Sequence, residues 1–131
     1  MDKRWFEQYQ DGIPHEIDTG QYASVVDLFK ESCNKYAKKV AYSNIGSELT
    51  FSEVNKLSHD FGAYLQQLGL KKGARVAIMM PNLLQYPVAI FGILRAGYVV
   101  VNTNPLYTSD ELEHQMNDAG AEAILVLANF A

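Results

Sequence analysis

The sequence predicts an α/β fold in which a mainly parallel sheet is flanked by helices. Three short apolar runs without alternation, 75–80, 98–101 and 123–127, have the pattern of parallel strands that are covered on both faces. A helical pattern separates each run from the next, and this order favours right-handed parallel crossovers. No helical pattern follows the third run, so we expect the sheet to continue in further sequence.

Length and composition predict one domain of ordinary solubility. The chain has 131 residues, 48% of them hydrophobic, and a net charge of −4. This length fits a single domain with an apolar core. The absence of a basic stripe argues against nucleic acid as a partner. The amino terminus has no signal-peptide pattern, and the longest apolar run, around Val88–Leu94, is far shorter than the roughly 20 residues that span a bilayer. We therefore expect a cytoplasmic protein.

Residues 1–23 differ from the rest because they contain several turn formers and show no convincing period. We interpret them as an extended amino-terminal arm, and residues 24–131 as the α/β portion of a truncated domain. The arm is expected to lie over a larger body. Its candidate anchors are four apolar residues: Trp5, Phe6, Tyr9 and Ile13.

The first helix is predicted to begin after Ser24, a good N-cap residue that is followed by the first-turn acid Asp27. Apolar side chains then recur on one helical face: Val25, Phe29, Cys33 and Tyr36. Cys33 is the single cysteine of the chain, which excludes an intrachain disulfide. We expect it to be a buried core residue, because neither a histidine nor a run of cations in the nearby sequence marks it as reactive.

Residues 40–51 are predicted to form a short hairpin that leads into a long helix. Thr50 and Glu53 have the spacing of a capping box, and Leu49 and Val54 have that of a hydrophobic staple. The expected apolar stripe of this helix consists of five residues, and Gly69 follows it as a helix stop: Val54, Leu57, Phe61, Leu65 and Leu68.

Two further helices connect the predicted strands. The first covers 83–96 and is apolar on nearly all sides, so we expect it inside the protein, although Pro87 leaves its first residue ambiguous. A polar loop over 102–107 precedes the second helix. There Thr108 and Glu111 repeat the capping-box spacing.

No catalytic constellation is visible in the sequence. Neither common phosphate-binding loop, G-x-G-x-x-G or G-x-x-x-x-G-K-[ST], occurs. Acidic residues crowd the start of the last helix, where the helix dipole favours negative charge. The three histidines lie on separate predicted elements without partners at metal-ligand spacing: His15, His59 and His114. We therefore expect no catalytic residue and no metal ligand in residues 1–131.

Segments along essentially the whole chain carry a resemblance to a known family, and they begin with Trp5, Tyr9, 12–14 and 16–17, which resemble the opening W…Y…G-[VI]-P-x-E-I of bacterial long-chain fatty acid–CoA ligases. Three of them, 49–54 (L-T-F-S-E-V), 75–82 (R-V-A-I-M-M-P-N) and 93–98 (I-L-R-A-G-Y), resemble early motifs of the adenylate-forming superfamily, which includes acyl-CoA synthetases, luciferases and peptide-synthetase adenylation domains. Two more, 102–108 (N-T-N-P-L-Y-T) and 111–115 (E-L-E-H-Q), are similar to those of bacterial long-chain fatty acid–CoA ligases. The resemblance thus identifies the chain as an incomplete part of the large amino-terminal domain of an adenylate-forming enzyme.

The resemblance implies an enzymatic activity that requires family motifs not found in residues 1–131. Such ligases use ATP and Mg²⁺ to convert a fatty acid into an acyl-adenylate, and coenzyme A then takes the acyl group as a thioester. The family's phosphate loop, its adenine and ribose motifs and its catalytic lysine have no counterpart here, so these residues alone are expected to be inactive and to bind no cofactor. The resemblance also suggests a homodimer and a peripheral contact with the inner membrane.

One loop is a candidate binding site for coenzyme A. In related synthetases the loop after the second conserved strand lies near the pantetheine arm of coenzyme A. In this sequence the loop precedes a helix amino terminus, where backbone donors are expected to be free, and it contains Asn104, Pro105, Leu106 and Tyr107. The alternative is a loop shaped only for chain reversal.

Two other functions stay open at this level. A free-standing α/β binding or partner-docking module would require nothing beyond the predicted sheet and helices. Another adenylate-forming enzyme, such as an aryl-CoA ligase or a luciferase, would share most of these motifs.

Overall fold

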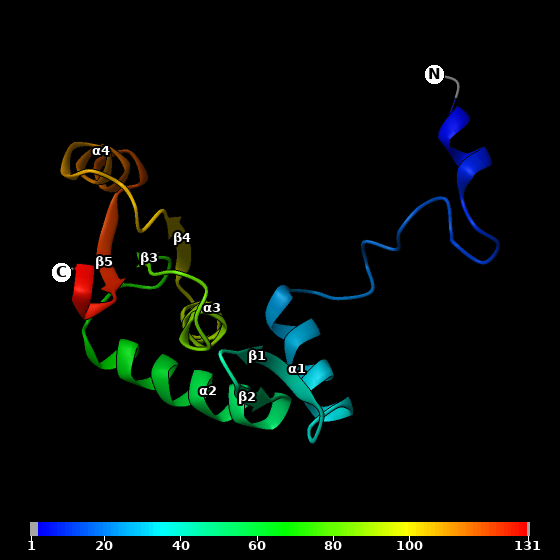
Figure 1. The fold of residues 1–131 in the computed structure, drawn as a ribbon, viewed down its shortest axis with the longest axis horizontal. Coiled ribbons are helices and arrows are strands. Elements are labelled where there is room, and N and C mark those ends of the chain that lie inside the picture. The colour runs from blue at the N-terminus through cyan, green and yellow to red at the C-terminus, as the bar shows by residue number, and fades with distance from the viewer. Residues whose placement is uncertain (1–2, 131) are drawn as a thin grey trace.

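The computed structural model describes residues 3–130, and it shows a parallel sheet with helices packed around it (Figure 1). In chain order the elements are the 3₁₀ helix η1 (Arg4–Gln8), α1 (Val25–Lys35), β1 (Val40–Asn44), β2 (Ser47–Thr50), α2 (Phe51–Gln67), β3 (Arg75–Met79), α3 (Gln85–Arg95), β4 (Val99–Thr103), α4 (Ser109–Ala119), β5 (Ala121–Val126) and the 3₁₀ helix η2 (Ala128–Phe130).

The three predicted strands form one sheet with the order β4-β3-β5. Both pairs of neighbours are parallel, and Ile78 in β3 lies between Asn102 of β4 and Leu125 of β5. The parallel α/β fold predicted from the sequence is confirmed. The middle strand is also buried on both faces, as its unbroken apolar run predicts, since residues 76–79 are all buried.

The prediction that the two outer strands are covered on both faces is wrong. In β5 the exposed and partly buried residues alternate over its first half, and Ile124 keeps 44% of its surface exposed. In β4, Val99 is also exposed. Each of these strands has a single neighbour in the described residues, and the helices cover them only in part. In addition, β4 runs on to Thr103, so Asn102 and Thr103 belong to the strand and not to the expected loop.

Helices α2 and α3 cross at very close range, and α3 in turn packs on the sheet. A Cβ atom added at Gly92 of α3 would lie 2.6 Å from Cδ1 of Phe61 and 3.1 Å from the carbonyl oxygen of Ser58. A Cβ atom added at Gly62 of α2 would lie 3.0 Å from the carbonyl oxygen of Gly92. The two backbones are therefore in contact, because small residues from each helix face one another.

This crossing corrects the predicted apolar stripe of α2. Val54 and Leu65 are buried as expected, but Leu57 is 42% exposed and Leu68 is 51% exposed. The buried face of α2 instead consists of Val54, Ser58, Gly62 and Leu65. A polar and a small residue fill its middle because a larger side chain would push α3 away.

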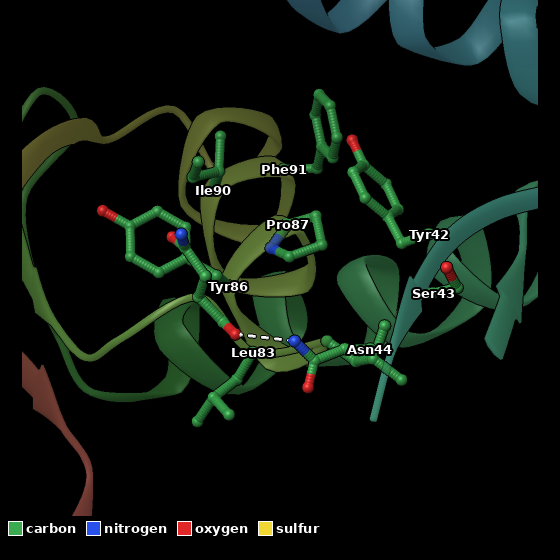
Figure 2. Close-up of a pocket in the computed structure, with 10 residues that line it drawn as sticks. Tyr42, Ser43, Asn44, Leu83, Tyr86, Pro87, Ile90 and Phe91 are labelled. Carbon is green, nitrogen blue, oxygen red and sulfur yellow. Dashed lines mark hydrogen bonds between the residues drawn. The ribbon is translucent and has the colours of Figure 1, made fainter. Parts of the chain in front are cut away.

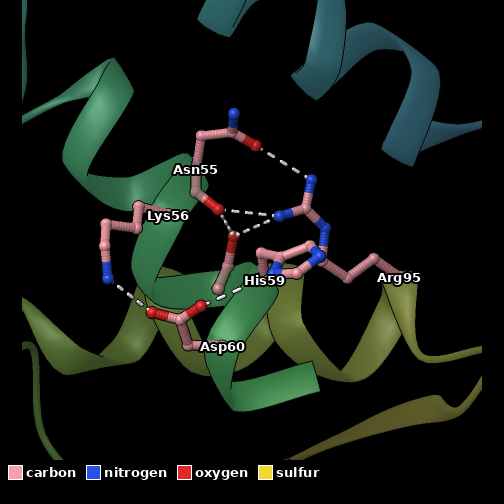
Figure 3. A network of polar contacts seen from close by, with 6 residues as sticks. Asn55, Lys56, His59, Asp60 and Arg95 are labelled. Atoms are coloured by element: carbon pink, nitrogen blue, oxygen red, sulfur yellow. Dashed lines mark hydrogen bonds and ion pairs between the residues drawn. The ribbon is translucent and has the colours of Figure 1, made fainter. Parts of the chain in front are cut away.

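The two helices are also joined by a polar network around Arg95 of α3 (Figure 3). The guanidinium group donates to the backbone carbonyl of Asn55 at 2.7 Å, to the Asn55 side-chain oxygen at 2.9 Å and to Ser58 Oγ at 3.1 Å. It also lies over the ring of Phe29 in α1, 5.7 Å from the centroid. Arg95 thus connects three helices.

A second, smaller core lies where α1 and the β1–β2 hairpin meet α2. It is built from buried Phe29, Cys33 and Val54, and Phe29 stacks on Phe91 of α3 with 3.7 Å between the ring centroids. The expected burial of Cys33 is confirmed, and that burial raises the pKa of its thiol. Val25, which was expected on the same face, is exposed.

The helix ends follow the predicted capping chemistry. The side chain of Ser24 accepts the backbone N–H of Asp27, which confirms it as the N-cap of α1. Thr50 with Glu53, and Thr108 with Glu111, form two complete capping boxes. Pro87 is the third residue of α3, so it lies in the first turn, where proline is tolerated.

The arm stands away from the α/β body in Figure 1. Its aromatic residues pack on one another: the ring of Phe6 stacks on His15 at 4.2 Å and meets Trp5 and Tyr9 edge to face. Trp5, Tyr9 and Ile13 remain exposed. Within the described residues these side chains therefore form a cluster of the arm itself, and do not anchor it to the body.

Candidate functional site

The carboxyl ends of the three parallel strands meet at one edge of the sheet, which we call the carboxyl edge. The register sets Met79 of β3 beside Thr103 of β4 and Val126 of β5. In open α/β sheets this edge is where ligands bind, because loops and helix amino termini converge there. The candidate loop Asn104–Tyr107 follows β4 directly and therefore lies at this edge.

The β4–α4 loop, residues 104–107, is closed by hydrogen bonds of its first residue. The side-chain oxygen of Asn104 accepts the N–H of Leu106 at 3.0 Å, and its backbone oxygen accepts the N–H of Tyr107 at 3.2 Å. Pro105 lies inside this turn. The side chain of Leu106 is 81% exposed and that of Tyr107 is half-buried. The loop is thus a rigid turn that presents an apolar side chain to its surroundings.

The expectation of free backbone donors at the start of α4 is only partly met. Thr108 N donates to the carboxylate of Glu111 at 2.8 Å, and Glu111 N donates to Thr108 Oγ1 at 3.4 Å. The hydrogen bonds from Thr108 hold the pKa of Glu111 below its usual value. A carboxylate therefore already occupies this helix end, and the loop offers a neutral, partly apolar surface rather than a cradle for an anion.

Two side chains bind Asn102, which lies two residues before this loop. The hydroxyl of Tyr86, near the start of α3, donates to Asn102 Oδ1 at 2.9 Å. Nε2 of Gln115 in α4 donates to the backbone oxygen of Asn102 at 3.0 Å. Oε1 of Gln115 is buried and has no hydrogen-bond partner among the described residues. Sequence reasoning did not assign a role to any of these three residues.

A groove of about 320 Å³ lies beside the carboxyl edge, between the hairpin and α3 (Figure 2). Its walls include the rings of Tyr42, Tyr86 and Phe91. Two further lining residues are joined by a hydrogen bond from Asn44 Nδ2 to the carbonyl oxygen of Asn82 at 2.9 Å. Burial raises the pKa of the Tyr42 phenol. The groove is suited to an apolar or aromatic group.

The histidines do not gather at the carboxyl edge. His15 stacks in the arm, His59 lies next to Asp60 on α2 with 3.4 Å between Nδ1 and Oδ1, and His114 is exposed on α4. Across residues 3–130 there is no group of three or more His, Cys, Asp or Glu side chains that could hold a metal ion. The residues described do not fit a magnesium site. Nor is any described helix both long and apolar enough to cross a membrane.

Fold and sequence together define the class of protein. The profile of the AMP-binding enzyme family matches residues 29–130, which is most of the chain, so the chain belongs to this family. This confirms the resemblance to adenylate-forming enzymes.

Two similar curated relatives are bacterial long-chain-fatty-acid–CoA ligases. The chain is 58% identical over its whole length to the long-chain-fatty-acid–CoA ligase of Escherichia coli O6:H1 (strain CFT073), and it covers 24% of that protein. It is 39% identical to the enzyme of the same name from Bacillus subtilis (strain 168), over 95% of this chain and 22% of that one. The chain thus spans about a quarter of the length of these relatives.

Solved structures agree with this fold. An anthranilate CoA ligase in complex with anthranoyl-AMP superimposes with a TM-score of 0.78 at 27% identity, over 83% of this chain and 21% of that chain. The amino-terminal subdomain of Klebsiella oxytoca NpsA gives a TM-score of 0.76 at 23% identity, over 79% of this chain and 26% of that chain. Both structures support the predicted α/β fold.

Proposed function

We propose that this chain is the amino-terminal part of a long-chain fatty acid–CoA ligase. The observation that carries the proposal is the 58% identity to such a ligase over every residue of the chain. In the proposed reaction a fatty acid carboxylate oxygen bonds to the α-phosphorus of ATP, and pyrophosphate leaves. The coenzyme A thiolate then forms a C–S bond at the acyl carbon, and AMP leaves with the bonding electrons of the broken C–O bond.

Residues 1–131 contribute to that reaction as a structural scaffold. They also contribute one surface that binds a substrate. The described residues contain no metal-binding cluster, so Mg²⁺ and the transferring phosphoryl group are assigned to the rest of the ligase. The isolated chain should therefore show no ATP–pyrophosphate exchange when it is incubated with a fatty acid, ATP and Mg²⁺. Exchange above the blank would contradict this assignment.

The binding surface is the β4–α4 loop, where Asn104, Pro105, Leu106 and Tyr107 face the pantetheine arm of coenzyme A. The exposed Leu106 and the half-buried ring of Tyr107 support this proposal, because the pantetheine arm is neutral and partly apolar. The closed capping box at Thr108 supports it too, since that helix end is already occupied by a carboxylate and is unfavourable for the phosphates of coenzyme A.

A chimera tests the proposed function. Residues 1–131 would replace the matching quarter of the Escherichia coli ligase, and acyl-CoA formation from palmitate, ATP and coenzyme A would be measured. We expect activity within about tenfold of the parent enzyme, because a fold of the same family with 58% identity preserves the packing of its interior. A chimera that is soluble and folded, but forms no acyl-CoA, would rule the function out.

The same chimera allows the assembly of the ligase to be measured. From its family we propose a homodimer in the cytoplasm with peripheral contact to the inner membrane. Analytical ultracentrifugation should give the mass of two chains, and sedimentation with vesicles of inner-membrane lipid should bring down part of the protein. A monomer in the first measurement, or no binding in the second, would remove the corresponding proposal.

A further inference from the structure

Asn102 connects three elements at the carboxyl edge, because side chains from α3 and α4 both bind it. It lies in β4, paired with the fully buried Ile78 of β3, so its backbone position is fixed by the sheet. Tyr86 binds its side chain and Gln115 binds its carbonyl oxygen. We propose that Tyr86 and Gln115 are positioning residues, which fix the β4–α4 loop in the orientation that coenzyme A requires.

The geometry explains why two separate sequence motifs belong together. Asn102 opens the segment 102–108, and Gln115 closes the segment 111–115. The hydrogen bond of 3.0 Å between them ties the helix back onto the strand that precedes it. The loop between them therefore has both of its ends fixed to each other. A loop with fixed ends loses less conformational entropy when a ligand orders it.

The amide of Gln115 indicates that this hydrogen bond has a role beyond packing. Its Nε2 must face Asn102, because the carbonyl oxygen of Asn102 only accepts hydrogen bonds. That orientation leaves Oε1 buried without a partner among the described residues. A buried acceptor without a donor destabilises a fold, so an apolar side chain such as methionine would be favoured here if packing were the only demand.

Tyr86 connects α3 to the same residue, Asn102. Its ring lines the groove of Figure 2, and its hydroxyl donates a hydrogen bond to Oδ1 of Asn102. Removing the hydroxyl alone would leave the ring in place and free the Asn102 side chain. Asn104 begins the loop turn only two residues after Asn102. We therefore expect the added mobility of Asn102 to increase the mobility of the loop as well.

Hydrogen exchange on the chain itself tests the positioning. The reporters are the amides of Leu106 and Tyr107, which are both bonded to Asn104. Tyr86→Phe and Gln115→Met should each speed exchange at these amides about two- to fivefold, the effect of losing one hydrogen bond at a solvent-accessible site. The matched control is Tyr98→Phe, which removes a hydroxyl bonded to the carbonyl oxygen of Leu70 at 3.2 Å, before β4 begins. It should leave the loop amides unchanged.

Kinetics in the chimeric ligase test the consequence, which rests on the proposed function. Tyr86→Phe and Gln115→Met should each raise KM for coenzyme A about two- to fivefold. ATP–pyrophosphate exchange should keep the parent rate, since adenylation precedes thiol binding. Tyr98→Phe should change neither quantity. A purely structural role for Tyr86 and Gln115 would lower stability and total activity without this division.

Hydrogen exchange tests the positioning role, and the kinetics of the chimera test its link to coenzyme A. Unchanged exchange at Leu106 and Tyr107 in both variants would overturn the positioning role, whatever the chimera does. Faster exchange together with an unchanged KM for coenzyme A in an active chimera would overturn the link to coenzyme A. An inactive parent chimera would contradict the proposed function and that link, while the exchange result would still decide whether the loop is held from Asn102.

Discussion

The guanidinium group of Arg95 donates a 2.7 Å hydrogen bond to the backbone carbonyl of Asn55, although the two residues lie 40 positions apart in the sequence. Asn55 is in the interior of α2, and its carbonyl oxygen also accepts the hydroxyl of Ser58 at 3.1 Å, so Arg95 and Ser58 share this acceptor. The bond lies next to the point where Gly62 and Gly92 bring the helices together, since a Cβ atom added at Gly62 would lie 3.3 Å from Cγ of Arg95. Close backbone packing and a charged hydrogen bond thus act on the same crossing.

Replacing Arg95 should loosen this crossing. Arg95→Met keeps most of the side-chain volume but removes three hydrogen bonds, so we expect a loss of about 1.5–3 kcal/mol in the free energy of unfolding, as for charged hydrogen bonds. Arg95→Lys should recover only part of it, because one ammonium cannot reproduce the forked geometry. Urea unfolding measures both. As a control, Lys56→Met removes an exposed ion pair of α2 and should leave the midpoint unchanged.

Alanine at the two glycines should also destabilise the protein. Gly92→Ala and Gly62→Ala gain roughly 1 kcal/mol of helix propensity, but each forces a Cβ atom against backbone of the other helix. We expect net losses of about 1–3 kcal/mol, the range of overpacked interiors. Ala63→Gly, on the exposed side of α2, isolates the propensity effect. If both alanine variants were more stable than the parent in urea, the tight crossing would be wrong.

The hairpin turn contains a residue in an unfavourable conformation. Ile45 has φ 47°, and its side chain is 92% exposed. A β-branched residue is strained in this left-handed region, whereas asparagine tolerates it. Ile45→Asn should therefore raise the free energy of unfolding by about 0.5–1 kcal/mol. Gly46→Ala, at φ 76°, should have the opposite sign. Thermal unfolding of both variants checks the pair of predictions.

The two capping boxes make stability depend on pH in the acid range. Hydrogen bonds from Thr50 and Thr108 hold the pKa of Glu53 and of Glu111 below the ordinary value of 4.5. When the folded-state pKa is the lower one, the stabilisation is present above the ordinary value and is lost as the pH falls through the folded-state pKa. The double variant Glu53→Gln/Glu111→Gln should lose less stability over this interval, measured as urea midpoints. An identical pH profile in both proteins would contradict the assignment.

The loop residues themselves should affect coenzyme A more than adenylation. In the chimeric ligase, Asn104→Ala removes the acceptor that closes the turn, and Tyr107→Ala removes a half-buried ring. Each should raise KM for coenzyme A by about three- to tenfold, the equivalent of roughly 1 kcal/mol of binding. ATP–pyrophosphate exchange serves as the internal control and should not change. Parent-like kinetics in both variants would favour a loop shaped only for chain reversal.

Local chemistry was predictable because it depends on residues close in sequence. The caps at Ser24, Thr50 and Thr108 follow from side chains three positions apart, and the structure has all of them. The central strand was equally clear, since an unbroken apolar run needs cover on both faces. The outer strands were misread because the same pattern does not reveal how completely helices cover the two faces of a strand.

Features that depend on distant residues gave no usable pattern. Ser58 and Gly62 face α3, yet hydropathy assigns such residues to the surface, and their role appears only when Gly92 is opposite them. The contact of Tyr86 with Asn102 likewise requires α3 and β4 to be placed side by side. Motif segments marked the right region of the chain, but the atoms that join those segments follow from the tertiary structure.

The position of β3 in the middle of the sheet has a consequence for biosynthesis. Its two partners both come later in the chain, so while a ribosome extends the polypeptide this strand, the most buried of the three, emerges before either neighbour exists. The hairpin and α2 can pair early through short-range contacts, whereas β3 acquires its second partner only once Val126 has left the exit tunnel. Until β4 emerges the nascent chain exposes a strand with two open edges, and one edge stays open until β5 follows, which makes this stretch a natural client for chaperones.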